Sequence, residues 1–166
     1  MSKAENGESW FGVPVAALKP LDEDHASEAL RDLAELAGER DLPRLAKLSA
    51  GKSPLAQFLA AVFDLSPFMR DYARRWPQVL ERLYDTSVVA RLETLLAEIR
   101  QCGIAPDQSE SSLMRALRER KGEAHFLIAL ADLSGEAGSE VTVRRLSALA
   151  DACVSAAIDF LLLDAH

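Results

Sequence analysis

The chain has 166 residues, of which 49% are hydrophobic and 27% are charged, and its formal net charge is −7. This length and composition suit one folded domain with a substantial core and exclude a largely disordered chain. The acidic balance disfavours nucleic-acid binding, because neutralising phosphates requires a basic surface. We therefore expect no nucleic-acid partner.

The N-terminus and the two cysteines favour a cytoplasmic protein. No apolar signal core follows Met1, and charged residues interrupt the apolar stretches, so we expect neither a secretory signal nor a membrane span. Cys102 and Cys153 lie in helix-like patterns without the spacing of metal ligands. This is typical of free thiols in a reducing compartment.

The first half of the chain predicts short helices. Residues 1–20 contain glycines and prolines that break any helical period, so we expect a lead-in arm there and a helical domain over residues 21–166. Asp22 is a typical N-cap, and apolar residues then recur at helical spacing up to a stop at Gly38. A short helix is expected from Pro43 to Ala50.

Proline-containing pairs mark the next boundaries. Ser53-Pro54 and Ser66-Pro67 each place an N-cap before a proline at the first helical position. Trp76-Pro77 marks another boundary, because the residue before a proline disfavours helix. One or two helical turns are expected from Gln78 to Tyr84.

Longer helices complete the chain. One is expected from Ser87 to Gly103, a second from Ser109, and a third from Ser139 onwards. The residues of the last helix that are predicted to face inward are Leu146, Leu149, Val154, Ala157, Ile158 and Leu161. No stretch alternates for long enough to make a strand. The sequence therefore predicts an all-α fold, an irregular helical bundle of about seven or eight helices with short ones first and two long ones last.

Two local patterns resemble binding motifs but have simpler explanations. Gly51-Lys52-Ser53 resembles the end of a phosphate-binding loop, which requires an earlier glycine after a strand. Ala46 occupies that position within a helical pattern, so we favour a helix stop followed by a helix start. The carboxylates of Asp22-Glu23-Asp24 suit a divalent metal, but acidic residues also favour the first turn of a helix, and we favour capping.

The three histidines do not indicate a metal site or a hydrolytic triad. His25, His125 and His166 have no ligand spacing, and no nucleophile stands beside them at a diagnostic distance in sequence. We expect His25 to be solvated and His125 to lie at the boundary of an apolar face. No catalytic residue and no metal ligand is predicted.

A basic row at the start of the long helix is the one charge feature that suggests a binding site. Arg115, Arg118 and Lys121 are spaced three residues apart, and Arg120 belongs to the same cluster. Such a row can attract a phosphate or an acidic partner. A solvated helix face near Glu119 and Glu123 is the alternative.

Two stretches carry a family resemblance. The first begins Ser66-Pro67-Phe68 and ends Trp76-Pro77. The second runs from Leu113 to Phe160 and combines an arginine-rich helix start with three short segments, which are Ala131-Asp132-Leu133, Glu140-Val141-Thr142 and Leu146 to Ala152. Both resemble the glutamine synthetase adenylyltransferases. The second is similar to the helical stretch that precedes the first nucleotidyltransferase core of that family.

The resemblance implies a bifunctional parent enzyme that adds AMP to glutamine synthetase and removes it in response to nitrogen status, with the PII signal protein as a partner. ATP and magnesium are implied for that parent, whose catalytic signature is a Gly-Ser turn followed by an Asp-x-Asp pair. This chain lacks the signature, because no Gly-Ser precedes Asp22 and Asp24. We therefore expect a non-catalytic, N-terminal helical part of a larger chain, without a cofactor of its own, that braces the nucleotidyltransferase core.

The last helix is apolar around much of its circumference, and such a helix requires a cover. In a longer chain the catalytic domain would cover it, whereas an isolated chain would pair with a second copy as a homodimer. The alternative function is a free-standing helical protein-interaction module without enzymatic activity. That module would use the same apolar surface or the row at Arg115.

Overall fold

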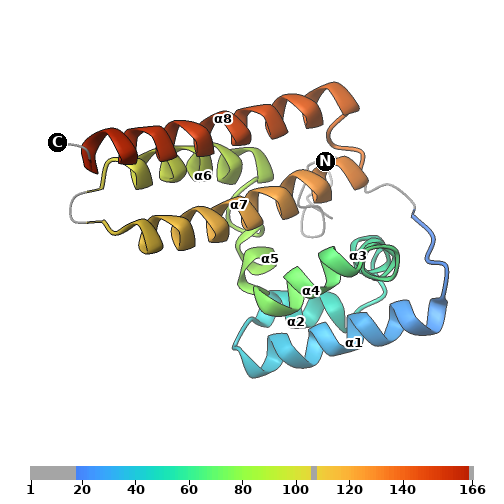
Figure 1. Cartoon of the computed structure of the whole chain (residues 1–166). Coiled ribbons are helices and arrows are strands. Elements are labelled where there is room, and N and C mark those ends of the chain that lie inside the picture. Colours follow the sequence, from blue (N-terminus) through green and yellow to red (C-terminus); the bar gives the residue numbers. More distant parts are fainter. Residues whose placement is uncertain (1–17, 106–107, 165–166) are drawn as a thin grey trace, which may run out of the picture. The chain divides into compact units, whose positions relative to one another are not determined.

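The computed structural model describes residues 18–105 and 108–164, and every element within these ranges is a helix (Figure 1). The prediction of an all-α fold is confirmed. The chain forms two compact units, Met1–Ser87 with Leu133–Glu136, and Val88–Asp132 with Ala137–His166. The single helical domain from residue 21 stays a prediction, and most of the predicted arm lies outside the described residues.

The first unit is built on a long helix against which shorter helices pack. Its helices are α1 (Glu23–Glu39), α2 (Pro43–Ser49), α3 (Pro54–Leu65), α4 (Pro67–Arg75) and α5 (Gln78–Arg82). Helix α1 contacts α2, α3 and α4. Large apolar side chains fill the space between them, among them Phe58, Phe63, Leu33, Leu45, Leu59, Met69 and Leu80. The core of this unit is therefore built from bulky apolar side chains, although Phe68 stays about half exposed.

The predicted serine caps are present in the first unit. The Ser53 Oγ accepts a hydrogen bond from the Ala56 amide, and the Ser66 Oγ accepts one from the Met69 amide. Ser66 also ends α3, so a single residue separates two helices. Each cap satisfies an amide that has no partner within its own helix.

The end of α1 differs slightly from the prediction. The helix passes through Gly38 and ends at Glu39, and the left-handed conformation falls on Asp41, with φ of 56°. Aspartate tolerates this region better than most side chains. The helix therefore ends one residue after the predicted stop, at Glu39 instead of Gly38.

The second unit contains the long helices α6 (Val88–Gly103), α7 (Glu110–Leu133) and α8 (Ser139–Asp164). Helices α6 and α8 lie side by side (Figure 1). Their backbones approach closely at Gly103, where an added Cβ atom would overlap the Ala156 carbonyl oxygen. Only glycine fits at this position without a shift of the helices.

A buried ion network joins α6 to α7. Arg91 donates to both carboxylate oxygens of Glu123, at 2.6 and 3.0 Å, and to Glu98 at 2.8 Å. Arg120 lies 3.2 Å from the second oxygen of Glu98. The bonds to Glu123 and then Glu98 raise the pKa of Arg91 further above its ordinary value, so the pair stays ionised. Because its members are largely buried, removing one partner would leave a charge without compensation.

The predicted inward face of α8 is wrong for most of its residues. Leu149 is buried as predicted, but Val154, Ile158 and Leu161 are 59%, 50% and 63% exposed, and Leu146 is exposed as well. The buried sector of α8 instead carries Leu149 with the small residues Ala152 and Ala156. Apolar residues surround the helix, so periodicity alone did not reveal which sector is covered.

Among the described residues, α8 is the one helix that is long and apolar enough to cross a membrane, over the 25 residues Ser139–Leu163. Residues 146–163 carry no charged residue except Asp151 and Asp159. These two charges are too few to take the helix out of the range of length and composition that a membrane span requires. Length and composition do not separate a membrane span from a helix whose open side is covered by another protein surface.

We predict that Gly103→Ala destabilises the chain by about 1–3 kcal/mol, because the added methyl group meets the Ala156 backbone and forces α6 and α8 apart. Urea unfolding followed by circular dichroism measures this change. Gly38→Ala is the matched control, since no atom lies within 4 Å of its added Cβ. The control should be stabilising by up to about 1 kcal/mol, owing to the higher helix propensity of alanine. Equal stability of the Gly103 variant and the original chain would contradict the close contact.

Candidate functional site

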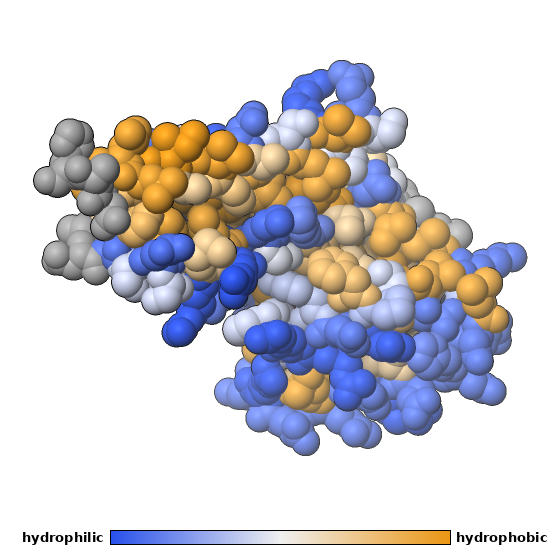
Figure 2. Space-filling model, in the orientation of Figure 1, coloured by the Kyte–Doolittle hydropathy of each residue, from blue (hydrophilic) through white to orange (hydrophobic). Residues whose placement is uncertain are grey.

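The exposed apolar side of α8 is the main candidate for a binding surface. We call it the α8 face; it consists of Val143, Leu146, Val154, Ile158, Leu161, Leu162 and Leu163. Figure 2 shows apolar side chains gathered over the second half of this helix. A contiguous apolar surface of this kind marks an interaction site in a folded protein.

The end of the α8 face requires a cover that reaches around the helix. Leu161, Leu162 and Leu163 are consecutive, and all three are more than half exposed. Successive residues of an α-helix are about 100° apart, so these side chains span roughly 200° of its circumference. A single flat contact covers less than this, and a surface that surrounds the helix end fits better.

The basic row predicted from sequence lies on the first half of α7. Arg115, Arg118 and Lys121 are exposed, and they form no hydrogen bond or ion pair with the residues that the structure describes. Arg120 belongs elsewhere, since it lies against Glu98 and donates to the Ala116 carbonyl oxygen. The sequence cluster thus divides into one structural arginine and three solvent-facing cations. Their role in binding stays a prediction.

The basic row lies level with the second half of α8. Ala124 and Ile128 of α7 line an apolar pocket of about 210 Å³ together with Ala148 and Leu149 of α8. The two helices run in opposite directions (Figure 1). Moving back along α7 from Ala124 towards its start therefore leads towards the end of α8.

The pKa shifts of Cys153 and His125 support a position of Lys121 beside α8. Burial raises the pKa of the Cys153 thiol on α8, and the charge of Lys121 opposes that rise. Burial, followed by the effect of Lys121, lowers the pKa of His125, which is half-buried at the expected boundary position. Lys121 is therefore close to α8.

A second polar cluster escaped the sequence analysis. The Asp64 carboxylate is almost fully buried and accepts hydrogen bonds from the amides of Leu21 and Asp22 and from His25 Nδ1 at 2.7 Å. Arg70 lies 2.7 Å from His25 Nε2. Because arginine only donates, Nε2 accepts and Nδ1 carries the proton. The His25 side chain is 42% exposed, as a solvated residue would be, but the sequence did not reveal that two neighbours fix both of its ring nitrogens.

The cluster around Asp64 is structural. It joins the start of α1 to the end of α3 and to Arg70 on α4. A histidine that acts as a general base needs a free acceptor nitrogen facing a nucleophile, and Arg70 occupies that nitrogen here. Residue spacing gave no signal for the cluster, because 39 positions separate His25 from Asp64.

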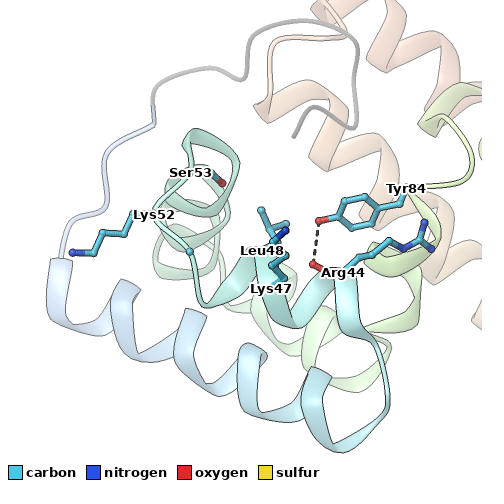
Figure 3. A pocket seen from close by; sticks show the side chains of 7 residues that line it. Arg44, Lys47, Leu48, Lys52, Ser53 and Tyr84 are labelled. Atoms are coloured by element: carbon cyan, nitrogen blue, oxygen red, sulfur yellow. Dashed lines mark hydrogen bonds between the residues drawn. The ribbon is translucent and has the colours of Figure 1, made fainter. Parts of the chain in front are cut away.

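The first unit also contains an open pocket of about 620 Å³, lined by Arg44, Lys47, Leu48, Gly51, Lys52, Ser53 and Tyr84 (Figure 3). Its positive charge is largely compensated, because Arg44 donates to Glu81 and to both oxygens of Asp85. Lys52 points away from the other labelled side chains. Arg44 therefore contributes little to the attraction of anions into this pocket.

The two motif-like patterns fold as the simpler explanations predicted. Ser53 caps α3 with its Oγ, and Ala46 lies within helix α2, so no phosphate-binding loop forms. The Asp22 carboxylate accepts from the amides of Asp24 and His25 and so caps α1. In the described ranges no three His, Cys, Asp or Glu side chains gather to hold a metal.

Comparison with known proteins places this chain in one family. The family model of glutamate-ammonia ligase adenylyltransferase matches residues 56–166. A bifunctional glutamine synthetase adenylyltransferase/adenylyl-removing enzyme of Mesorhizobium japonicum is 57% identical over 157 residues, which cover 95% of this chain and 16% of that protein. The enzymes with the same description from Brucella suis and Agrobacterium fabrum are 44% and 35% identical over 94% and 100% of the chain. The chain spans 16–17% of these relatives. No solved structure matches.

We predict that Asp64→Asn lowers the melting temperature by several degrees. The hydrogen bonds from His25 and from the backbone amides of Asp22 and Leu21 hold the pKa of Asp64 below its ordinary value. Its carboxylate therefore stabilises the fold above about pH 4, and this contribution is lost as the pH falls through the lowered pKa.

Thermal unfolding between pH 7 and pH 2 tests this. The difference between the original chain and Asp64→Asn should be largest at neutral pH and shrink in acid. Glu28→Gln is the control, because Glu28 is exposed on α1 and makes no ion pair with the described residues. A difference that stays constant with pH would contradict a stabilising charge at Asp64.

Proposed function

Because the chain belongs to the glutamate-ammonia ligase adenylyltransferase family, we propose that it is a non-catalytic helical part of a bifunctional glutamine synthetase adenylyltransferase and adenylyl-removing enzyme. In this role it braces a nucleotidyltransferase core that acts in nitrogen regulation. The observation that carries the proposal is the α8 face, a row of large apolar side chains left open to solvent.

The α8 face fits a cover supplied by the rest of a longer polypeptide. Helix α8 lies entirely within the matched residues 56–166, and the matched relatives are about six times longer than this chain. Exposed apolar residues are densest at Leu161, Leu162 and Leu163. Burying them removes apolar area from water, which is the main driving force for docking two domains.

The catalytic parts are proposed to lie in the remainder of the enzyme. No Gly-Ser followed by Asp-x-Asp occurs in the printed sequence, and the only Asp-x-Asp, at Asp22 and Asp24, serves to cap and start α1. ATP and magnesium would bind the nucleotidyltransferase core. Glutamine synthetase would be the substrate, PII a regulator of the complete enzyme, and the cytoplasm its location.

We predict that the isolated chain neither transfers AMP from ATP to glutamine synthetase in the presence of magnesium nor removes AMP from the modified protein. Radiolabelled AMP incorporation and release measure both reactions. The complete Mesorhizobium japonicum enzyme is the positive control. Clear turnover by the isolated chain would show that it carries a catalytic site.

The bracing role predicts that Leu161→Glu separates this chain from its core. The test uses a chimera in which the chain replaces the matching region of the Mesorhizobium japonicum enzyme, with a protease site after His166. Once the chimera has folded and been cleaved, the two halves should stay associated. Leu161→Glu should weaken their association at least about tenfold, because it buries an unpaired charge in an apolar contact. Size exclusion and titration of the separated halves give the affinity.

Leu21→Glu is the matched control. Leu21 is also an exposed leucine, at 89%, but it belongs to the first unit. It should leave the affinity unchanged. Circular dichroism of the isolated variants should show unchanged folding, since both side chains face solvent. Halves that separate on cleavage without any substitution would contradict the proposal. They would favour a free-standing interaction module.

A further inference from the structure

We infer that the surface covering α8 carries carboxylates beside its apolar contact, placed to meet Arg115 and Arg118. The inference rests on the proposed function, since it describes the segment of the remaining polypeptide that docks on the α8 face. It goes further by assigning a chemistry to that segment: large apolar side chains flanked by aspartate or glutamate.

The charges of the second unit support this assignment. Arg91, Arg120 and Arg144 each contact a carboxylate within the unit, at Glu123, Glu98 and Glu140 respectively. Arg115 and Arg118 have no such contact with the described residues, although the whole chain has a net charge of −7. Exposed arginines next to an uncovered apolar surface are typical of interface positions.

The position of the two arginines links them to the apolar contact. Ala124 of α7 shares a pocket with Leu149 of α8, and Lys121 acts on Cys153. Arg118 and Arg115 are about one and two turns earlier on α7 than Lys121, so they lie level with the second half of α8. A segment that covers Leu161 to Leu163 and continues over the first half of α7 would reach both guanidinium groups.

Two other covers fit less well. A two-fold dimer through α8 pairs the same patch with itself, so both copies would bring Arg115 and Arg118 to the one interface, where their positive charges add. An anionic lipid surface would meet Asp151, which is exposed on α8 next to the apolar residues. A protein surface avoids both conflicts, because it can place carboxylates near the arginines and keep them away from Asp151.

The test reverses both charges in the cleaved chimera. Arg115→Glu with Arg118→Glu should weaken the association of the halves roughly tenfold at about 0.1 M salt, because attraction becomes repulsion at two positions. The loss should largely disappear at about 1 M salt, where the Debye length falls to about 3 Å. Arg115→Lys with Arg118→Lys keeps the charge and should retain most of the affinity.

The matched control is Arg31→Glu with Arg82→Glu. Both residues are exposed in the first unit without an ion pair to the described residues, so the control changes net charge equally at a distant place. It should leave the affinity unchanged. Circular dichroism and urea unfolding of each isolated variant establish that the fold is intact.

The outcomes separate this inference from the proposed function. If Leu161→Glu separates the halves but charge reversal has no larger effect than the control, the cover is apolar only and the inference is overturned. It is also overturned if the isolated chain forms a dimer that charge reversal abolishes, as measured by sedimentation. Binding of the isolated chain to phosphatidylglycerol vesicles that charge reversal abolishes would overturn it as well.

Discussion

The second unit depends on the close approach of α6 and α8 at Gly103 and Ala156. Two helix backbones approach this closely only where both helices present small side chains, and α8 does so with Ala152 and Ala156. Turning its small residues inward forces α8 to turn its large apolar residues outward. The exposed α8 face is therefore a consequence of how this helix packs within its own unit.

The two units use their apolar residues differently. The first buries its bulkiest side chains, including Phe58 and Phe63, and fixes the ends of its helices with the Ser53 cap and the Asp64 carboxylate. Leu21, Leu65 and Phe68 nevertheless stay exposed on its surface. The second unit places the pair of Arg91 with Glu123 between α6 and α7, and it leaves the large aliphatic residues of the α8 face exposed.

Sequence patterns predicted the helices well because their boundaries are set locally. Ser66 followed by Pro67 starts a helix through its own hydroxyl and a fixed φ angle, whatever the rest of the chain does. The orientation of α8 could not be predicted, since apolar residues on all sides give no preferred face. The cluster of His25, Asp64 and Arg70 was also missed. It joins residues 39 and 45 positions apart, and only the packing of three helices brings them together.

For the same reason, the sequence predicted only part of the candidate site. Spacing alone put Arg115 and Arg118 on one helix, but it grouped Arg120 with them, and the structure assigns that residue to Glu98. The distinction matters physically. An arginine that pairs within its own unit stabilises the fold. An arginine that faces solvent beside an apolar surface can instead guide and orient a partner, while the burial of the apolar side chains supplies the affinity. In the proposed bracing role, the apolar residues of the second half of α8 would supply the buried contact, and the arginines of the first half of α7 would fix its orientation.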